Sequence, residues 1–270
     1  MLAPVPLGVL ENGRELSLDV LAPWHVALQG QSRSGKSNSA YVLLGRLSRF
    51  ENVLVCGCDP TGLLLMPWQS YPFPEWRACG GSSDFVGVIE SLVGEMDRRI
   101  ALLVSGMESG VYADKLSEFT LEMPLLVVVL EEYPGLLSFL DSQDKALGRK
   151  AGDAYGARVR VGVRRLIQEG AKVGVRVVMI AQRFDASIVG GAERSNLGTR
   201  ISHRVDNLDA IRMLHPSADS ELMERVGTFE PGYGYIEQVG CEARVFRSYI
   251  ADYGTYARTV VERGKSRGCA

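Results

Sequence analysis

The sequence has no long apolar run and no excess of charge of one sign. Its 30 Lys and Arg residues nearly balance 32 Asp and Glu residues, which gives a formal net charge of −2. Apolar stretches such as Leu125 to Leu130 are far too short for a membrane span, and the N-terminus lacks a basic-then-apolar signal pattern. We therefore expect a soluble, cytoplasmic protein without a membrane span. A near-neutral charge still permits a local basic lining that holds DNA.

Cysteine and histidine are too sparse to indicate a metal centre. The five Cys are odd in number, and Cys56 and Cys58 lie inside an apolar run. His25, His203 and His215 offer no pair at ligand spacing. Buried free thiols in a reducing cytosol explain the cysteines better than disulfides or a zinc site.

Alternating strand and helix patterns predict an α/β fold. Apolar stretches with the length of buried strands are separated by segments with helical spacing. The expected strands cover residues 24–29, 52–58, 124–130, 175–181 and 199–205, and the expected longer helices cover 36–50, 85–103 and 158–174. This order predicts a mostly parallel sheet flanked by helices.

A hairpin and a tail are expected at the two ends of this core. Val5 to Val20 alternate in polarity around the typical turn sequence Glu11-Asn12-Gly13, which predicts an N-terminal hairpin within residues 1–22. Two closing strands are expected at 233–238 and 243–250, after short helices at 208–214 and 220–226. The sequence has no internal repeat and no interdomain linker. We therefore expect a single domain over residues 1–253 and a polar tail over residues 254–270.

One glycine-bounded loop fits the Walker A pattern G-x-x-x-x-G-K-S. Its residues are Gly30, Gln31, Ser32, Arg33, Ser34, Gly35, Lys36 and Ser37. The loop lies between an apolar strand and a helix, which is the context that the motif requires. Backbone N–H groups and the helix dipole can hold phosphates, Lys36 can reach the β- and γ-phosphates, and Ser37 can ligate Mg²⁺. The motif predicts ATP and Mg²⁺ as cofactors; the alternative is a plain glycine turn.

Two adjacent acids end the most apolar strand. Successive residues at a strand end point in different directions, so Glu131 can face a magnesium ion while Glu132 faces the attacking water. The alternative is a solvated acidic strand end. Gln182, at the end of the next strand, can sense the γ-phosphate or orient water, although a polar residue at a strand end is often merely solvated.

The ordered set of motifs resembles the motor domain of the FtsK/SpoIIIE translocases, within the FtsK/HerA group. Beyond Walker A, the shared strings are Pro6-Leu7-Gly8, His25, Asp59-Pro60, Glu95-Met96-Asp97-Arg98-Arg99, Glu131-Glu132-Tyr133, Ala181-Gln182-Arg183, residues 199–205 and residues 209–212. The resemblance implies a RecA-like P-loop NTPase fold and a single FtsK-like ATPase domain. It departs at Glu131, where the family usually has Asp.

The resemblance also implies roles for individual residues. Ser37 and Glu131 would be Mg²⁺ ligands, Glu131 through water, and Glu132 would polarise the attacking water. Gln182 would be the γ-phosphate sensor. Arg200, with Arg204 as the second candidate, would face the nucleotide of a neighbouring subunit. The competing interpretation is that Arg200 forms a salt bridge within its own sheet.

The function that these roles imply is an ATP-hydrolysing ring, expected to be a homohexamer, that moves double-stranded DNA. Residues 144–176 carry nine basic and three acidic side chains, so we expect the DNA grip there or, alternatively, a solvated helix face. The expected DNA-binding residues are Arg158, Arg160, Arg164 and Arg165. The lack of membrane segments and of a winged-helix module favours plasmid transfer, a mobile element or a phage. Alternatives are a protein-export motor and a nucleotide-gated assembly module with little turnover.

Overall fold

A computed structural model describes residues 3–71, 79–80, 84–184 and 190–268. Within these residues a single sheet of ten strands has the order β2-β1-β10-β9-β8-β3-β7-β6-β4-β5. The strands are β1 (Val5–Leu10), β2 (Glu15–Leu18), β3 (Val26–Gln29), β4 (Val53–Asp59), β5 (Cys79–Gly80), β6 (Leu125–Glu131), β7 (Val175–Ala181), β8 (Thr199–Ser202), β9 (Tyr233–Gln238) and β10 (Arg244–Ser248).

The sheet combines a parallel half with an antiparallel half. Strands β8, β3, β7, β6, β4 and β5 are all parallel to one another, whereas β9, β10, β1 and β2 add to β8 in antiparallel pairs. The predicted hairpin is present as β1 and β2, with Gly13 in the left-handed region at φ 79°. It pairs with β10 at the edge of the sheet. The prediction of a mostly parallel sheet with an N-terminal hairpin is confirmed.

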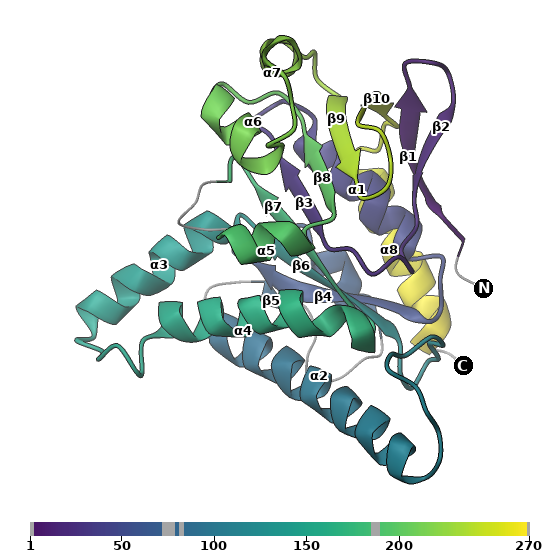
Figure 1. The fold of residues 1–270 in the computed structure, drawn as a ribbon, viewed down its shortest axis with the longest axis vertical. Coiled ribbons are helices and arrows are strands. Elements are labelled where there is room, and N and C mark those ends of the chain that lie inside the picture. The colour runs from purple at the N-terminus through teal and green to yellow at the C-terminus, as the bar shows by residue number, and fades with distance from the viewer. Residues whose placement is uncertain (1–2, 72–78, 81–83, 185–189, 269–270) are drawn as a thin grey trace.

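Helices cover both faces of the sheet (Figure 1). The helices are α1 (Lys36–Leu47), α2 (Phe85–Glu108), α3 (Tyr133–Ala146), α4 (Tyr155–Glu169), α5 (Gly191–Asn196), α6 (Leu208–Leu214), α7 (Ser220–Gly227) and α8 (Tyr253–Gly268), with 3₁₀ turns η1 (Met66–Ser70) and η2 (Gly170–Val173). In Figure 1, α2, α3 and α4 lie together on the near side, and α1 and α8 lie behind the sheet. Helix α3 fills a stretch for which the sequence pattern predicted no element. No helix in these described ranges has the length and apolar composition needed to cross a membrane.

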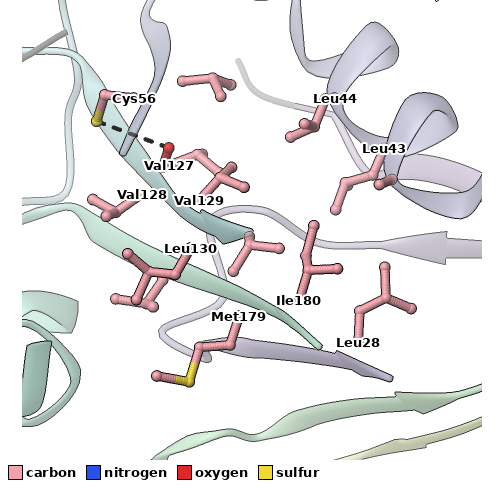
Figure 2. Close-up of a cluster of buried hydrophobic side chains, with 14 of the residues drawn as sticks. Leu28, Leu43, Leu44, Cys56, Val127, Val128, Val129, Leu130, Met179 and Ile180 are labelled. Atoms are coloured by element: carbon pink, nitrogen blue, oxygen red, sulfur yellow. Dashed lines mark hydrogen bonds between the residues drawn. The ribbon is translucent and has the colours of Figure 1, made fainter. Parts of the chain in front are cut away.

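The core lies where β4, β6 and β7 run side by side. Every residue from Leu125 to Leu130 is buried, and so is every residue of β4 and β7. Such continuous burial is typical of parallel strands covered on both faces. Figure 2 shows these side chains packed with Leu43 and Leu44 of α1, and with Cys56, whose thiol points at the carbonyl of Val127. Burial raises the pKa of Cys56 to about 12, so this cysteine is an inert, structural thiol, as expected.

The polar tail expected over residues 254–270 is instead largely helix. Helix α8 buries Tyr256 and Val260, and Tyr256 stacks on Tyr41 of α1 with ring centroids 5.1 Å apart. Two apolar residues four positions apart are enough for one contact stripe on a helix, although they barely alter the polar composition of the segment. The polar composition of the segment therefore concealed this helix.

Two motif residues prove to stabilise the fold. His25 donates from Nε2 to the carbonyl of Ile167 at 2.8 Å and accepts at Nδ1 from the amide of Val177 at 2.9 Å. Burial lowers the pKa of His25 to about 4, so the ring is neutral and ties α4 to β7. Arg99 is fully buried, where it donates to Glu95 at 2.7 Å and to the carbonyl of Val173 at 3.0 Å. Both residues therefore hold secondary-structure elements together.

Candidate nucleotide site

The Walker A loop, the acid pair and Gln182 meet at one edge of the sheet. Because β3, β6 and β7 are parallel, their carboxyl ends lie together, with Gln29 opposite Ala181 and Glu131 opposite Ile180. The loop after β3 is anchored there, since Gly30 N donates to the carbonyl of Ala181 at 3.3 Å. We call this edge, with Lys36, Glu131, Glu132 and Gln182, the phosphate edge.

The loop itself leaves no room for side chains at its two glycines. A Cβ on Gly30 would collide with Ser34 Oγ, and a Cβ on Gly35 would lie 2.5 Å from Gly232 N, at a backbone φ of 107°. His203 supports the loop from below: it donates from Nδ1 to the carbonyl of Tyr233 at 2.6 Å and accepts from Ser39 Oγ at 2.9 Å. Burial lowers the pKa of His203 to about 4, so a neutral ring sits beneath the loop.

A cavity of about 430 Å³ opens beside the loop. Its lining residues are Gln31, Ser32, Arg33, Gly35, Lys36, Ser37, Asn38, Gln182 and Pro231. The structure thus places most of the predicted Walker A residues, and Gln182, around one space. Asn38 and Pro231 are lining residues that the motif did not predict, because Asn38 follows the pattern and Pro231 comes from a distant loop before β9.

Glu132, which faces the Walker A lysine, adopts a strained backbone conformation. Its φ of 46° and ψ of 47° lie in the left-handed region, which costs a non-glycine residue about 1–2 kcal/mol. Only one other non-glycine residue in the described ranges, Arg33 of the loop, has a positive φ. Lys36 Nζ lies 3.4 Å from Glu132 Oε2. The ion pair therefore favours a position of Glu132 that faces the Walker A lysine, at the cost of this backbone strain.

Glu131 presents a buried oxygen without a partner. Its Oε2 makes no hydrogen bond within the described residues. Burial raises the pKa of Glu131 to about 7; Lys36 opposes this shift, whereas Asp59 and Glu132 add to it. A buried carboxylate oxygen of this kind calls for a cation or a water. Mg²⁺ at a P-loop needs one hydroxyl and one carboxylate besides phosphates and waters, so Ser37 and Glu131 fit that ion.

The described ranges hold no cluster of three His, Cys, Asp or Glu side chains at metal-binding distance. A protein-only metal cage is thus not built into this part of the chain.

Sequence reasoning missed a buried polar network that starts at Gln29. Gln29 Nε2 donates to Ser202 Oγ at 2.8 Å, and Ser202 Oγ lies 2.7 Å from His215 Nε2. Because a carboxylate can only accept, His215 donates from Nδ1 to Glu237 at 3.0 Å and accepts at Nε2 from Ser202. Arg200 Nη1 approaches Glu237 at 3.4 Å. The only signal in the sequence was a glutamine at the end of an apolar strand.

The same glutamine contacts the segment that follows Gln182. The Oε1 atom of Gln29 accepts from the amide of Phe184 at 3.2 Å, while its Nε2 also donates to the carbonyl of Ala210 at 3.1 Å. Gln29 therefore fixes the end of β7, and with it Gln182, against β8 and α6.

Comparisons with known proteins find similarity in sequence and in fold. No protein-family model matches the chain. The DNA translocase FtsK of Campylobacter jejuni is 24% identical over 208 residues, which span 74% of this chain and 20% of that protein. The pCW3 conjugation coupling protein TcpA, solved with ATPγS, has a TM-score of 0.72 at 17% identity and covers 95% of this chain and 69% of its own. For the cytoplasmic domain of the Thermomonospora curvata type VII secretion ATPase EccC, the TM-score is 0.67 at 19% identity, over 95% of this chain and 31% of its own.

The chain resembles an FtsK-type motor domain. The resemblance predicted from the motifs is confirmed by the curated relatives, and the α/β fold of P-loop ATPases is confirmed by the structural neighbours. The chain spans only 20% of the length of the Campylobacter jejuni FtsK and 28% of that of a second FtsK, from Vibrio vulnificus. Activities of those whole proteins are therefore proposals for this chain.

The predicted FtsK-type finger, Arg200, is engaged inside its own sheet. Besides Glu237, its guanidinium donates to the carbonyls of Leu197 at 2.9 Å and Arg194 at 3.1 Å. Only 14% of the side chain is exposed. Arg204 lies closer to the loop, since its carbonyl accepts from Gln31 N at 2.9 Å. Within this chain, the structure places Arg200 in a salt bridge in its own sheet, which was the competing interpretation.

The four arginines expected to hold DNA are paired with acids on neighbouring helices. We call this set the α4 face. The pairs are Arg158 with Glu90 (2.8 Å), Arg160 with Asp141 (2.6 Å), Arg164 with Glu193 (2.5 Å), and Arg165 with Asp97 (2.6 Å) and Glu169 (2.7 Å). The basic excess counted along the segment is therefore offset by acids from α2, α3 and α5. The sequence count missed them because four of the five lie outside the segment.

Proposed function

We propose that this chain is an ATPase whose hydrolysis of ATP drives a motor acting on double-stranded DNA. The observation that carries the proposal is the phosphate edge, where a glycine-bounded loop, its lysine and Gln182 line one cavity and Glu132 lies 3.4 Å from that lysine. The relatives named DNA translocase FtsK support the choice of DNA as the substrate polymer.

Each residue of the phosphate edge has a separate task in hydrolysis. In this proposal the loop amides and Lys36 hold the triphosphate. Ser37 and Glu131 would hold Mg²⁺, which would neutralise charge on the phosphates. Lys36 now lies 3.4 Å from Glu132. A γ-phosphate competes for this lysine, so substrate binding frees the Glu132 carboxylate to accept a proton from the attacking water. Gln182, which also lines the cavity, orients that water or contacts the γ-phosphate.

Assembly and the DNA grip form the second part of the proposal. We propose a homo-oligomeric ring, hexameric as in the sequence-based expectation, in which residues 144–176 face DNA. Within this stretch, Lys145 and Lys150 are exposed at the connection between α3 and α4, which projects away from the sheet (Figure 1). Because the α4 face is already paired, these two lysines are better placed than Arg158, Arg160, Arg164 and Arg165 to neutralise phosphates.

A protein-export motor is the second candidate. Its support is the structural similarity to EccC, a type VII secretion ATPase, whose fold this chain shares. The fold does not decide between the two substrates. A nucleotide-gated module with little turnover is the third candidate, favoured by the longer Glu131 in place of the family's usual Asp.

Stimulation of ATP hydrolysis by duplex DNA tests the proposal. We expect the purified protein to hydrolyse ATP, and to do so several times faster when duplex DNA is present. Unfolded polypeptide at the same mass concentration is the matched control. Stimulation by polypeptide alone would favour protein export, and no hydrolysis under any condition would favour the assembly module.

A further inference from the structure

An isoleucine is held in solvent next to Asn38, which lines the nucleotide cavity. Ile250 follows β10, and 88% of its surface is exposed. Its neighbours on both sides are fixed by one residue: Asn38 Nδ2 donates to the carbonyl of Tyr249 at 2.6 Å, and Asn38 Oδ1 accepts from the amide of Ala251 at 2.8 Å. Asn38 lines the cavity and lies in the first turn of α1. The isoleucine is therefore positioned beside the cavity by a lining residue.

The side chain of the preceding residue turns the other way. The Tyr249 ring lies 4.5 Å below the guanidinium of Arg46, and its hydroxyl donates to Glu15 at 3.0 Å. Tyr249 thus packs along α1 and the hairpin. Ile250 is left facing solvent, where an apolar side chain of this size gains contact only when a ligand or partner covers it.

The order of the strands gives the proposed nucleotide site two ends. Glu131 ends β6, and Glu132 and Gln182 follow β6 and β7, on one side of β3. Pro231 precedes β9 and Ile250 follows β10, on the other side of β3. Pro231 lines the cavity, and its neighbour Gly232 accepts from the amide of Ser248 at 2.9 Å, which ties the two loops together. A nucleotide with its γ-phosphate at the acids extends its base toward the second end.

We propose that Ile250 and Pro231 form the nucleobase subsite of this protein, with Ile250 covering one face of a purine. The inference rests on the proposed binding of ATP at the phosphate edge. Asn38 is a positioning residue here: its amide oxygen and both donors serve the backbone around Ile250 and Ser248 Oγ, so it shapes the subsite rather than reading the edge of the base.

The test compares a ligand that has a base with one that has none. Titration calorimetry with Mg²⁺ measures the Kd of ATPγS and of inorganic tripolyphosphate for the wild type, Ile250→Asp, Ile250→Ser and Ile250→Leu. We expect Ile250→Asp to weaken ATPγS by about tenfold and Ile250→Ser by about threefold, with Ile250→Leu close to wild type. The Kd of tripolyphosphate is expected to stay within about twofold in all of them.

A matched control is Val239→Asp, which places the same charge on an exposed apolar residue in the β9–β10 turn, 51% exposed. It should leave both dissociation constants unchanged. The subsite is refuted if Ile250→Asp binds ATPγS as the wild type does, or if it loses ATPγS and tripolyphosphate equally. A wild-type protein that binds neither ligand would instead refute the proposed nucleotide site, and the subsite with it.

Discussion

The phosphate edge and the α4 face both carry charged side chains, but they use them in opposite ways. At the phosphate edge, Glu131 has a buried oxygen without a partner in the described residues, and Glu132 holds a strained backbone angle. On the α4 face, every one of the four arginines has a carboxylate partner within 2.8 Å. The phosphate edge thus contains a buried carboxyl oxygen without a hydrogen-bond partner in the described residues, whereas the arginines of the α4 face are all paired.

This difference distinguishes residues that can bind a ligand from residues that only stabilise the fold. Unmet polar groups are costly in the folded chain, so they persist where a ligand completes them. Exposed ion pairs contribute about 0–1 kcal/mol each and need no ligand. A basic sequence segment is thus weak support for a nucleic-acid surface until the acids that fold against it are known.

The largest expected effect lies at the phosphate edge. We expect Glu132→Gln to lower the rate of ATP hydrolysis by about 100- to 10,000-fold while ATP binding persists, because the carboxylate acts only on the water. Lys36→Ala is expected to abolish measurable binding. Single-turnover hydrolysis and equilibrium binding of ATPγS separate the two. Wild-type hydrolysis by Glu132→Gln would move the base to Glu131.

Arg200 sharpens the comparison, because it has two competing interpretations: a catalytic finger for a neighbouring subunit, or a salt bridge to Glu237 within its own sheet. We expect Arg200→Ala to lower the free energy of unfolding by about 1–3 kcal/mol, since Glu237 and two carbonyls lose a largely buried donor. Urea denaturation measures the loss, and Arg212→Ala, 60% exposed on α6, is the control.

A catalytic role for Arg200 in a neighbouring subunit would give a different result. If Arg200 completes the site of a neighbouring subunit, its alanine variant keeps its stability and loses about three to five orders of magnitude in hydrolysis rate. Mixing that variant with Glu132→Gln would then restore turnover, because sound interfaces form between two inactive chains. The same measurements on Arg204→Ala decide whether the second candidate takes that role.

A smaller effect is expected at the proposed DNA grip, where the exposed lysines near the α3–α4 connection can be compared with the paired arginines of the α4 face. Changing Lys145 and Lys150 to Gln should reduce the salt dependence of DNA binding by about two units of slope, because each lysine neutralises one phosphate. Changing Arg158 and Arg160 to Gln should alter the slope by less than about half a unit, because these side chains already hold acids. Equal slopes for both double variants would contradict the distinction between free and paired cations.

The features that were easiest to predict from the sequence are those that depend on residues close together in the chain. The Walker A residues, the acid pair after β6 and the hairpin turn each depend on a few consecutive residues, so their local pattern sufficed. The same was true of the parallel sheet, because buried strands such as β6 are apolar throughout.

Interactions between residues far apart in the chain could not be predicted from the sequence. Arg158 meets an acid 68 positions away, and Gln29 meets Ser202 across 173 positions, so neither pairing leaves a mark in a local pattern. Helix α8 was missed because its buried face consists of little more than Tyr256 and Val260. His25 and Arg99 were noticed as motif residues, but only the folded chain shows that both are structural.

The most direct test of the motor is movement itself. Displacement of a third DNA strand from a duplex reports passage of the protein along that duplex, independently of how fast ATP is consumed. We predict displacement by the wild type with ATP and Mg²⁺, and none with ATPγS or with Glu132→Gln. Steady ATP hydrolysis without any displacement would contradict DNA translocation and leave protein export as the better account.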